Sequence, residues 1–98
     1  MPIHSEIRSK IHNLVMQLAD SNDSWYVILI EFIKLVLSIV KDILTGNNPD
    51  FDKKALEDFL VLEYMTYLNI KIIPDYFEEP IIRALVHELI DLVIKWFG

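Results

Sequence analysis

The first candidates for chemistry are a histidine and two carboxylates close to the C-terminal end of the chain. His87 and Asp91 lie four residues apart, with Glu88 directly after His87, so a helix would place His87 and Asp91 on one face. This spacing can supply two metal ligands, whereas zinc sites in proteins use three or four. The segment is not a zinc-protease motif either, because Asp91 stands where the second histidine would be. We therefore predict no metal site and expect His87 to be an exposed histidine.

A second candidate is the acidic segment that begins at Asp50, which starts like a calcium-binding loop. Such a loop requires glycine at its sixth position and glutamate at its twelfth. Here these positions hold Ala55 and Val61. The segment is therefore expected to contain a helix cap, provided by Asp50 or Asp52, because aspartate is a preferred N-cap residue.

The remaining reactive residue types lack the surroundings that catalysis requires. The serines occur without the Gly-x-Ser-x-Gly setting of a nucleophile elbow, and Gly46 and Gly98, the two glycines, cannot form a glycine-rich phosphate loop. The chain has no cysteine, which removes disulfides, thiolate metal sites and cysteine nucleophiles. We expect a protein without enzymatic activity and without a cofactor.

The elements that hold these residues are four predicted helices. They cover roughly residues 3–18, Trp25–Leu44, a third segment from Asp50 or Asp52 to about Leu68, and a last one whose first turn suits Pro80. Asn69–Pro74 is expected to be a short extended connector, and Asp75–Glu78 a capping box or a short turn. The predicted fold is an all-α, largely antiparallel four-helix bundle that forms a single domain over residues 1–98.

The second of these segments is unusually apolar. Its polar residues gather into one stripe and leave an apolar arc of roughly 220°, whereas a surface helix needs little more than about 100°. Its apolar residues form two seams, one starting at Trp25 and one at Tyr26, so we expect two packed neighbours and the most buried helix of the bundle. Gly46 is predicted to end the helix in a left-handed conformation, with Pro49 preventing its continuation.

Composition restricts the possible partners. A net charge of −6 argues against binding to nucleic acid, which needs a clustered basic face. Hydrophobic residues make up 53% of only 98 residues, and so short a chain cannot readily cover that much apolar surface. We therefore expect a small acidic protein that acts through protein–protein interaction, as a homodimer, a higher homo-oligomer or a partner of another protein.

The predicted association surface consists of aromatic and aliphatic residues in excess of one four-helix core. Aromatic anchors are enriched in such interfaces. The candidates are Trp25, Phe32, Phe59, Leu62, Trp96 and Phe97.

Lipid association is the alternative. The last predicted helix has a large apolar half and ends in Trp96-Phe97, residue types that favour membrane interfaces. Its polar half is mixed in sign rather than basic, and Glu31 and Lys34 interrupt the most apolar segment, so neither docking on anionic lipid nor membrane spanning is favoured. The N-terminal segment lacks the apolar core of a secretory signal, and the default expectation is a cytoplasmic protein.

Overall fold

The predicted all-α bundle is present in the computed structural model, which describes residues 5–46, 52–68 and 74–97. Within these ranges the chain forms α1 (Ser5–Ala19), α2 (Trp25–Thr45), α3 (Lys53–Glu63), a π-helical turn η1 (Tyr64–Leu68) and α4 (Asp75–Phe97), and no strand. The predicted extended connector falls largely on residues 69–73, which lie outside the described residues. The radius of gyration, 13.0 Å, equals the roughly 13 Å expected of a 100-residue domain.

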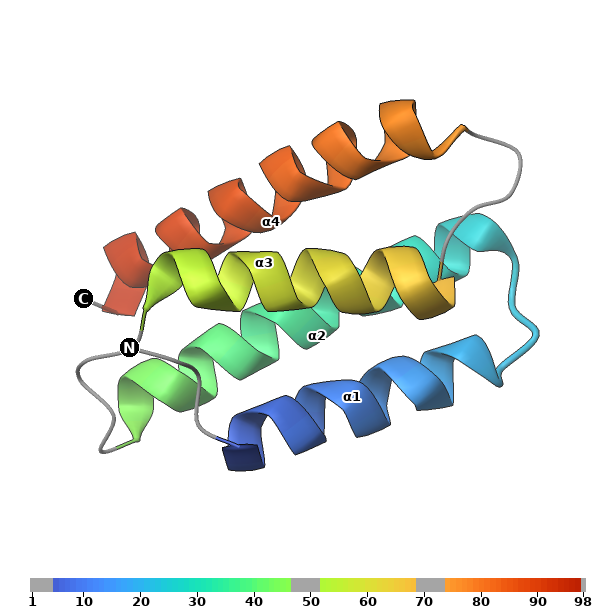
Figure 1. The fold of residues 1–98 in the computed structure, drawn as a ribbon. Helices are drawn as coiled ribbons and strands as arrows, with labels where there is room; N and C mark the ends of the chain where they lie inside the picture. Colours follow the sequence, from blue (N-terminus) through green and yellow to red (C-terminus); the bar gives the residue numbers. More distant parts are fainter. Residues whose placement is uncertain (1–4, 47–51, 69–73, 98) are drawn as a thin grey trace.

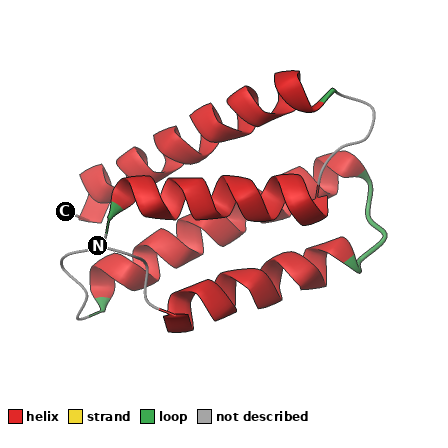
Figure 2. Ribbon diagram, viewed as in Figure 1, coloured by secondary structure: helices red, strands yellow, loops and turns green. Residues whose placement is uncertain are grey.

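The four helices alternate in direction along the chain (Figure 1). Helix α2 packs most extensively against α4 and also contacts α1, while α3 packs against α4 and α1. In Figure 2 the helices α1 and α4 lie on either side of the pair formed by α3 and α2. Consecutive pairs α1–α2 and α3–α4 are antiparallel, as predicted, whereas the packed neighbours α2 and α4 run in the same direction.

Helix ends are set by local chemistry that the sequence indicates only in part. Asp52 caps α3, since its carboxylate accepts hydrogen bonds from the backbone N–H groups of Lys54 and Ala55 at 3.0 and 3.1 Å. The prediction for Gly46 was wrong: its φ is −86° and its backbone is extended. Glycine is favoured there for another reason, because an added Cβ would lie 3.0 Å from the carbonyl oxygen of Asp42.

The start of α4 also differs from the prediction. The helix begins at Asp75, so the segment predicted as a capping box or short turn forms its first turn, and Pro80 lies inside it. The Pro74 carbonyl accepts hydrogen bonds from the N–H groups of Phe77 and Glu78 at 2.9 and 3.0 Å. Pro80 is exposed, so the helical carbonyl that its missing N–H leaves without a partner can bind water.

One hydrophobic core runs through the bundle, and α2 contributes more buried residues to it than any other described helix. Its buried row is Phe32, Leu35, Val36, Ile39, Val40 and Ile43. Phe32 contacts the ring of Tyr64, with ring centroids 4.9 Å apart. The Tyr64 hydroxyl donates to Glu78 at 3.0 Å, and burial together with this carboxylate raises the pKa of Tyr64.

Candidate interaction surfaces

The predicted interface residues lie in three different environments. Trp25, Leu62, Trp96 and Phe97 are exposed in the subunit, with Trp96 at 65%. Phe59 is half-buried against the core and has the Arg8 guanidinium 5.7 Å from the centre of its ring.

The prediction that Phe32 belongs to the association surface is wrong. This side chain is fully buried, so it belongs to the subunit core and cannot contact a partner. Phe32 and Trp25 belong to the same predicted seam of α2, but Trp25 lies at the first turn, where no neighbouring helix covers it. Periodicity gives the direction of a side chain and not its depth in the bundle.

Two exposed apolar rows run along α2 and α4. Residues at helical spacing share one side of their helix, and these rows are Tyr26 and Ile30 on α2, and Phe77, Ile81, Leu92 and Trp96 on α4. We call these six residues the α2–α4 face. Sequence reasoning placed Ile81 and Trp96 in the apolar half of the final helix and Phe77 in the capping segment before it, but it did not identify Tyr26, Ile30, Phe77, Ile81 or Leu92 as exposed.

The neighbours of α2 and α4 show that both rows border the same outer surface. Helix α2 meets α1 on the side that carries Asp42, whose carboxylate pairs with Lys10. Wound at about 100° per residue, Tyr26 and Ile30 lie on the other side, toward α4. Helix α4 meets α3 on the side of Arg83, and its exposed row lies away from α3, toward α2.

The α2–α4 face is comparable to the largest apolar patches found on monomers and smaller than one side of a standard interface. Its residues are between 39% (Leu92) and 65% (Trp96) exposed. Since a large apolar side chain offers roughly 150–250 Å², the face presents about 600 Å² of apolar surface. The largest apolar patch on a typical monomer covers roughly 300–600 Å², and a standard interface buries about 800 Å² on each partner, including its polar rim.

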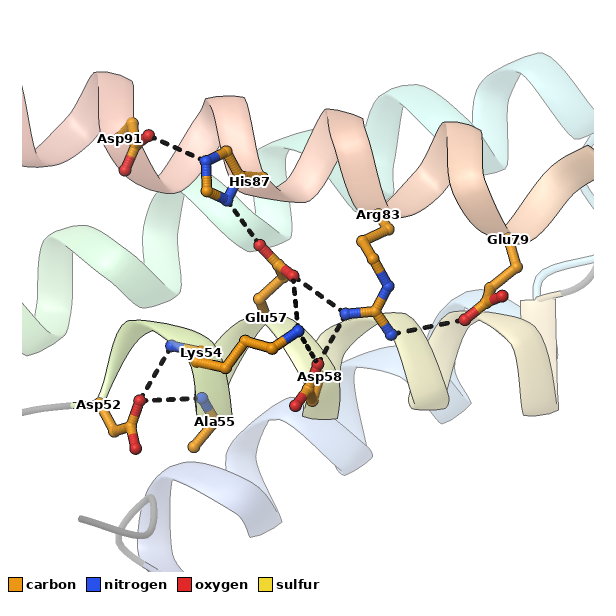
Figure 3. A network of polar contacts seen from close by, with 9 residues as sticks. All are labelled: Asp52, Lys54, Ala55, Glu57, Asp58, Glu79, Arg83, His87 and Asp91. Atoms are coloured by element: carbon orange, nitrogen blue, oxygen red, sulfur yellow. Dashed lines mark hydrogen bonds and ion pairs between the residues drawn. The ribbon is translucent and has the colours of Figure 1, made fainter.

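The opposite flank of α4 is polar and packed. Figure 3 shows Arg83 reaching from α4 to α3, where Nη1 donates to Glu57 at 2.9 Å and to Asp58 at 2.6 Å. His87 Nδ1 lies 2.7 Å from the other oxygen of Glu57, and its Nε2 lies 3.3 Å from Asp91. His87 is exposed, as predicted, but it also joins two helices.

Glu57 is the centre of this network, and sequence reasoning missed it. Its side chain is only 8% exposed. Burial raises the pKa of Glu57, but hydrogen bonds from His87 and Arg83 outweigh burial and hold the pKa below its ordinary value. Hydrogen bonds to Asp58 and Glu57 raise the pKa of Arg83, so the pair remains ionised. The sequence offered one signal: the i,i+4 spacing of Arg83, His87 and Asp91 on one face of α4.

A similar contact ties α3 to α1. Glu63, with a side chain 8% exposed, lies 3.1 Å from His12 Nδ1, and the His12 ring meets Tyr67 edge-on at 5.3 Å. Helix α3 therefore carries two buried carboxylates, each facing a histidine of a different neighbouring helix. These contacts join α3 to α1 and to α4.

Among the described residues, no group of three or more histidine or carboxylate side chains is placed to hold a metal ion. None of the described helices combines the length and the apolar character needed to cross a membrane.

Comparison with protein-family models, with curated proteins and with solved structures finds no match to this chain.

Proposed function

We propose that this protein acts through protein–protein interaction without enzymatic activity, and that it self-associates by pairing the α2–α4 face with the same face of a second copy. A cytoplasmic location is part of this proposal. The observation that carries it is the exposure of four large apolar residues, Phe77, Ile81, Leu92 and Trp96, on one side of α4. Covering such a row removes apolar area from water at about 25 cal/mol per Å².

A pair of charge substitutions tests which surface associates. Ile81 on the face and Leu62 on α3 are 61% and 62% exposed, so Ile81→Glu and Leu62→Glu place the same charge at equally exposed helical positions. We expect the unmodified protein to be dimeric or larger in sedimentation velocity. Ile81→Glu should raise the dissociation constant at least tenfold, because a buried unpaired carboxylate costs several kcal/mol, and Leu62→Glu should leave it unchanged.

Ile30→Glu supplies a second position on the neighbouring helix. If both helices belong to one interface, this variant should also dissociate the assembly. A protein that stays monomeric at every concentration would contradict the proposal. If Leu62→Glu alone dissociates the assembly, the interface lies on the outer side of α3.

Association with a lipid surface is the second candidate, favoured by the exposure of Trp96 and Phe97 at the end of α4. Amphipathic residues of this kind gather at membrane interfaces. Flotation with neutral phosphatidylcholine vesicles separates the two proposals. Protein that rises with the vesicles supports lipid binding, and protein that remains at the bottom while dimeric supports self-association.

A further inference from the structure

An open groove lies on the other flank of α4, between its N-terminal half and the end of α3. It encloses about 550 Å³, within the range of roughly 300–1,000 Å³ typical of ligand sites. Its lining residues are Asp58, Val61, Leu62, Met65, Asp75, Tyr76, Glu79 and Arg83. This set is called the α3–α4 groove.

The groove is apolar in its middle and acidic at its edge. Val61 is buried and Met65 half-buried, while Leu62 and Tyr76 are 62% and 73% exposed. An entering apolar side chain would therefore contact aliphatic and aromatic surface that water now covers. Such contacts favour an apolar group in the occupant.

The acidic edge has three lining carboxylates, Asp58, Asp75 and Glu79, beside Arg83, and Lys54 also pairs with Asp58 at 3.1 Å. Arg83 is the basic residue among those lining the groove. It already donates to Asp58 and to Glu79, at 2.6 and 3.4 Å, in addition to the buried Glu57 (Figure 3). The side chains of Asp58 and Glu79 remain 50% and 49% exposed, so both can accept hydrogen bonds from an occupant.

The charge at this edge persists at neutral pH. Hydrogen bonds from Arg83 and Lys54 hold the pKa of Asp58 below its ordinary value. Negative potential beside an apolar hollow selects an occupant that is both cationic and apolar. A second copy of this chain is a poor match, because it carries the same net charge of −6.

We propose that the α3–α4 groove binds a cationic amphipathic segment of another protein. An apolar side chain of that segment packs between Leu62 and Tyr76, and a neighbouring arginine or lysine pairs with Asp58 and Glu79. This site goes beyond the proposed self-association, since it uses the opposite flank of α4 and a different partner.

A fluorescein-labelled peptide of leucine and lysine with amphipathic helical spacing serves as the probe. Its counterpart, with every lysine replaced by glutamate, tests the charge requirement. We expect the lysine peptide to bind, as measured by fluorescence anisotropy, with an affinity that falls as salt increases. The glutamate peptide should not bind.

Matched variants locate the site. Asp58→Asn with Glu79→Gln removes two negative charges at the groove, and Glu6→Gln with Asp23→Asn removes two from exposed positions elsewhere. The groove variant should weaken peptide binding about tenfold or more, and the remote variant by about threefold or less. Leu62→Ser should weaken binding, whereas Ile30→Ser on the α2–α4 face should not.

Amide chemical-shift mapping with the same peptide supplies an independent readout. Shifts confined to the end of α3 and the first half of α4 support the proposal. Absence of binding, equal loss in the groove and remote variants, or shifts confined to the α2–α4 face would overturn it. A change of oligomeric state in Leu62→Ser would assign the groove to a second copy instead, and circular dichroism verifies that each variant is folded.

Discussion

The two flanks of α4 differ in almost every physical respect. Toward α3, Arg83 and His87 meet the buried carboxylate of Glu57 in a network of short polar contacts. Toward the outer surface beside α2, Phe77, Ile81 and Trp96 are largely exposed. The comparison teaches that the polar flank joins α4 to α3 within the subunit, whereas the apolar flank leaves large side chains exposed to solvent.

Substitution of a core residue beneath both flanks should cause the largest loss of stability. Phe32→Ala removes a fully buried ring and should lower the free energy of unfolding by about 3–5 kcal/mol. Trp25→Ala, on the same helix but exposed, should lower it by less than about 1 kcal/mol. Urea unfolding followed by circular dichroism measures both. Similar losses in the two variants would show that Trp25 is covered in solution.

The polar flank should show the next largest effect. Arg83→Ala leaves Glu57 buried with one fewer donor, and a buried acceptor that loses a partner costs about 1–3 kcal/mol. The same urea titration measures this loss. Arg83→Lys is a useful control, because lysine keeps the charge but lacks the second nitrogen, Nη2, that donates to Glu79. A free energy of unfolding unchanged in Arg83→Ala would refute a stabilising role for the network.

Lowering the pH should reveal the contribution of Glu57 to the free energy of unfolding. The pKa of Glu57 in the folded protein lies below the ordinary value of 4.5, so the unfolded chain binds its proton first as the pH falls. The ionised carboxylate therefore stabilises the fold above about pH 4.5, and this contribution disappears as the pH falls through the folded pKa. Unfolding free energies measured from pH 7 to pH 3 should decrease less steeply for Glu57→Gln. An equally steep decrease in both proteins would assign acid sensitivity to other carboxylates.

The apolar flank should show the smallest effect on subunit stability. Ile81 is 61% exposed, so Ile81→Ala should change the unfolding free energy of the monomer by about 0.5 kcal/mol or less. The same substitution should weaken dimerisation, which dilution in sedimentation experiments measures. A large loss of monomer stability with no effect on association would remove the contrast between the two flanks.

Most of the fold could be predicted from local sequence. The helix positions, the cap at Asp52 and the absence of strands among the described residues follow from periodicity and from capping chemistry. The early start of α4 was missed because Pro80 was interpreted as a first-turn proline, whereas the helix already begins at Asp75. Gly46 was misjudged because its backbone is extended and not left-handed, and a close approach to the Asp42 carbonyl favours glycine there.

The sequence predicted that an exposed apolar surface exists, but it did not predict the groove or the polar network. An excess of apolar residues indicated an exposed apolar surface, and two of the predicted interface residues, Trp96 and Leu62, are exposed in the subunit. Neither the groove nor Glu57 could be identified, because both depend on how α3 and α4 lie against each other. Glu57 and His87 are 30 positions apart in the sequence, and no local pattern relates them.

By itself, the sequence determined which side of each helix is apolar, because side-chain direction follows from the helical repeat. Only the tertiary structure decided which of those side chains are covered. Phe32 and Trp25 point along the same seam of α2, yet one is fully buried and the other is half exposed. Burial depends on whether another helix extends alongside that turn, and the packing of the whole bundle determines this.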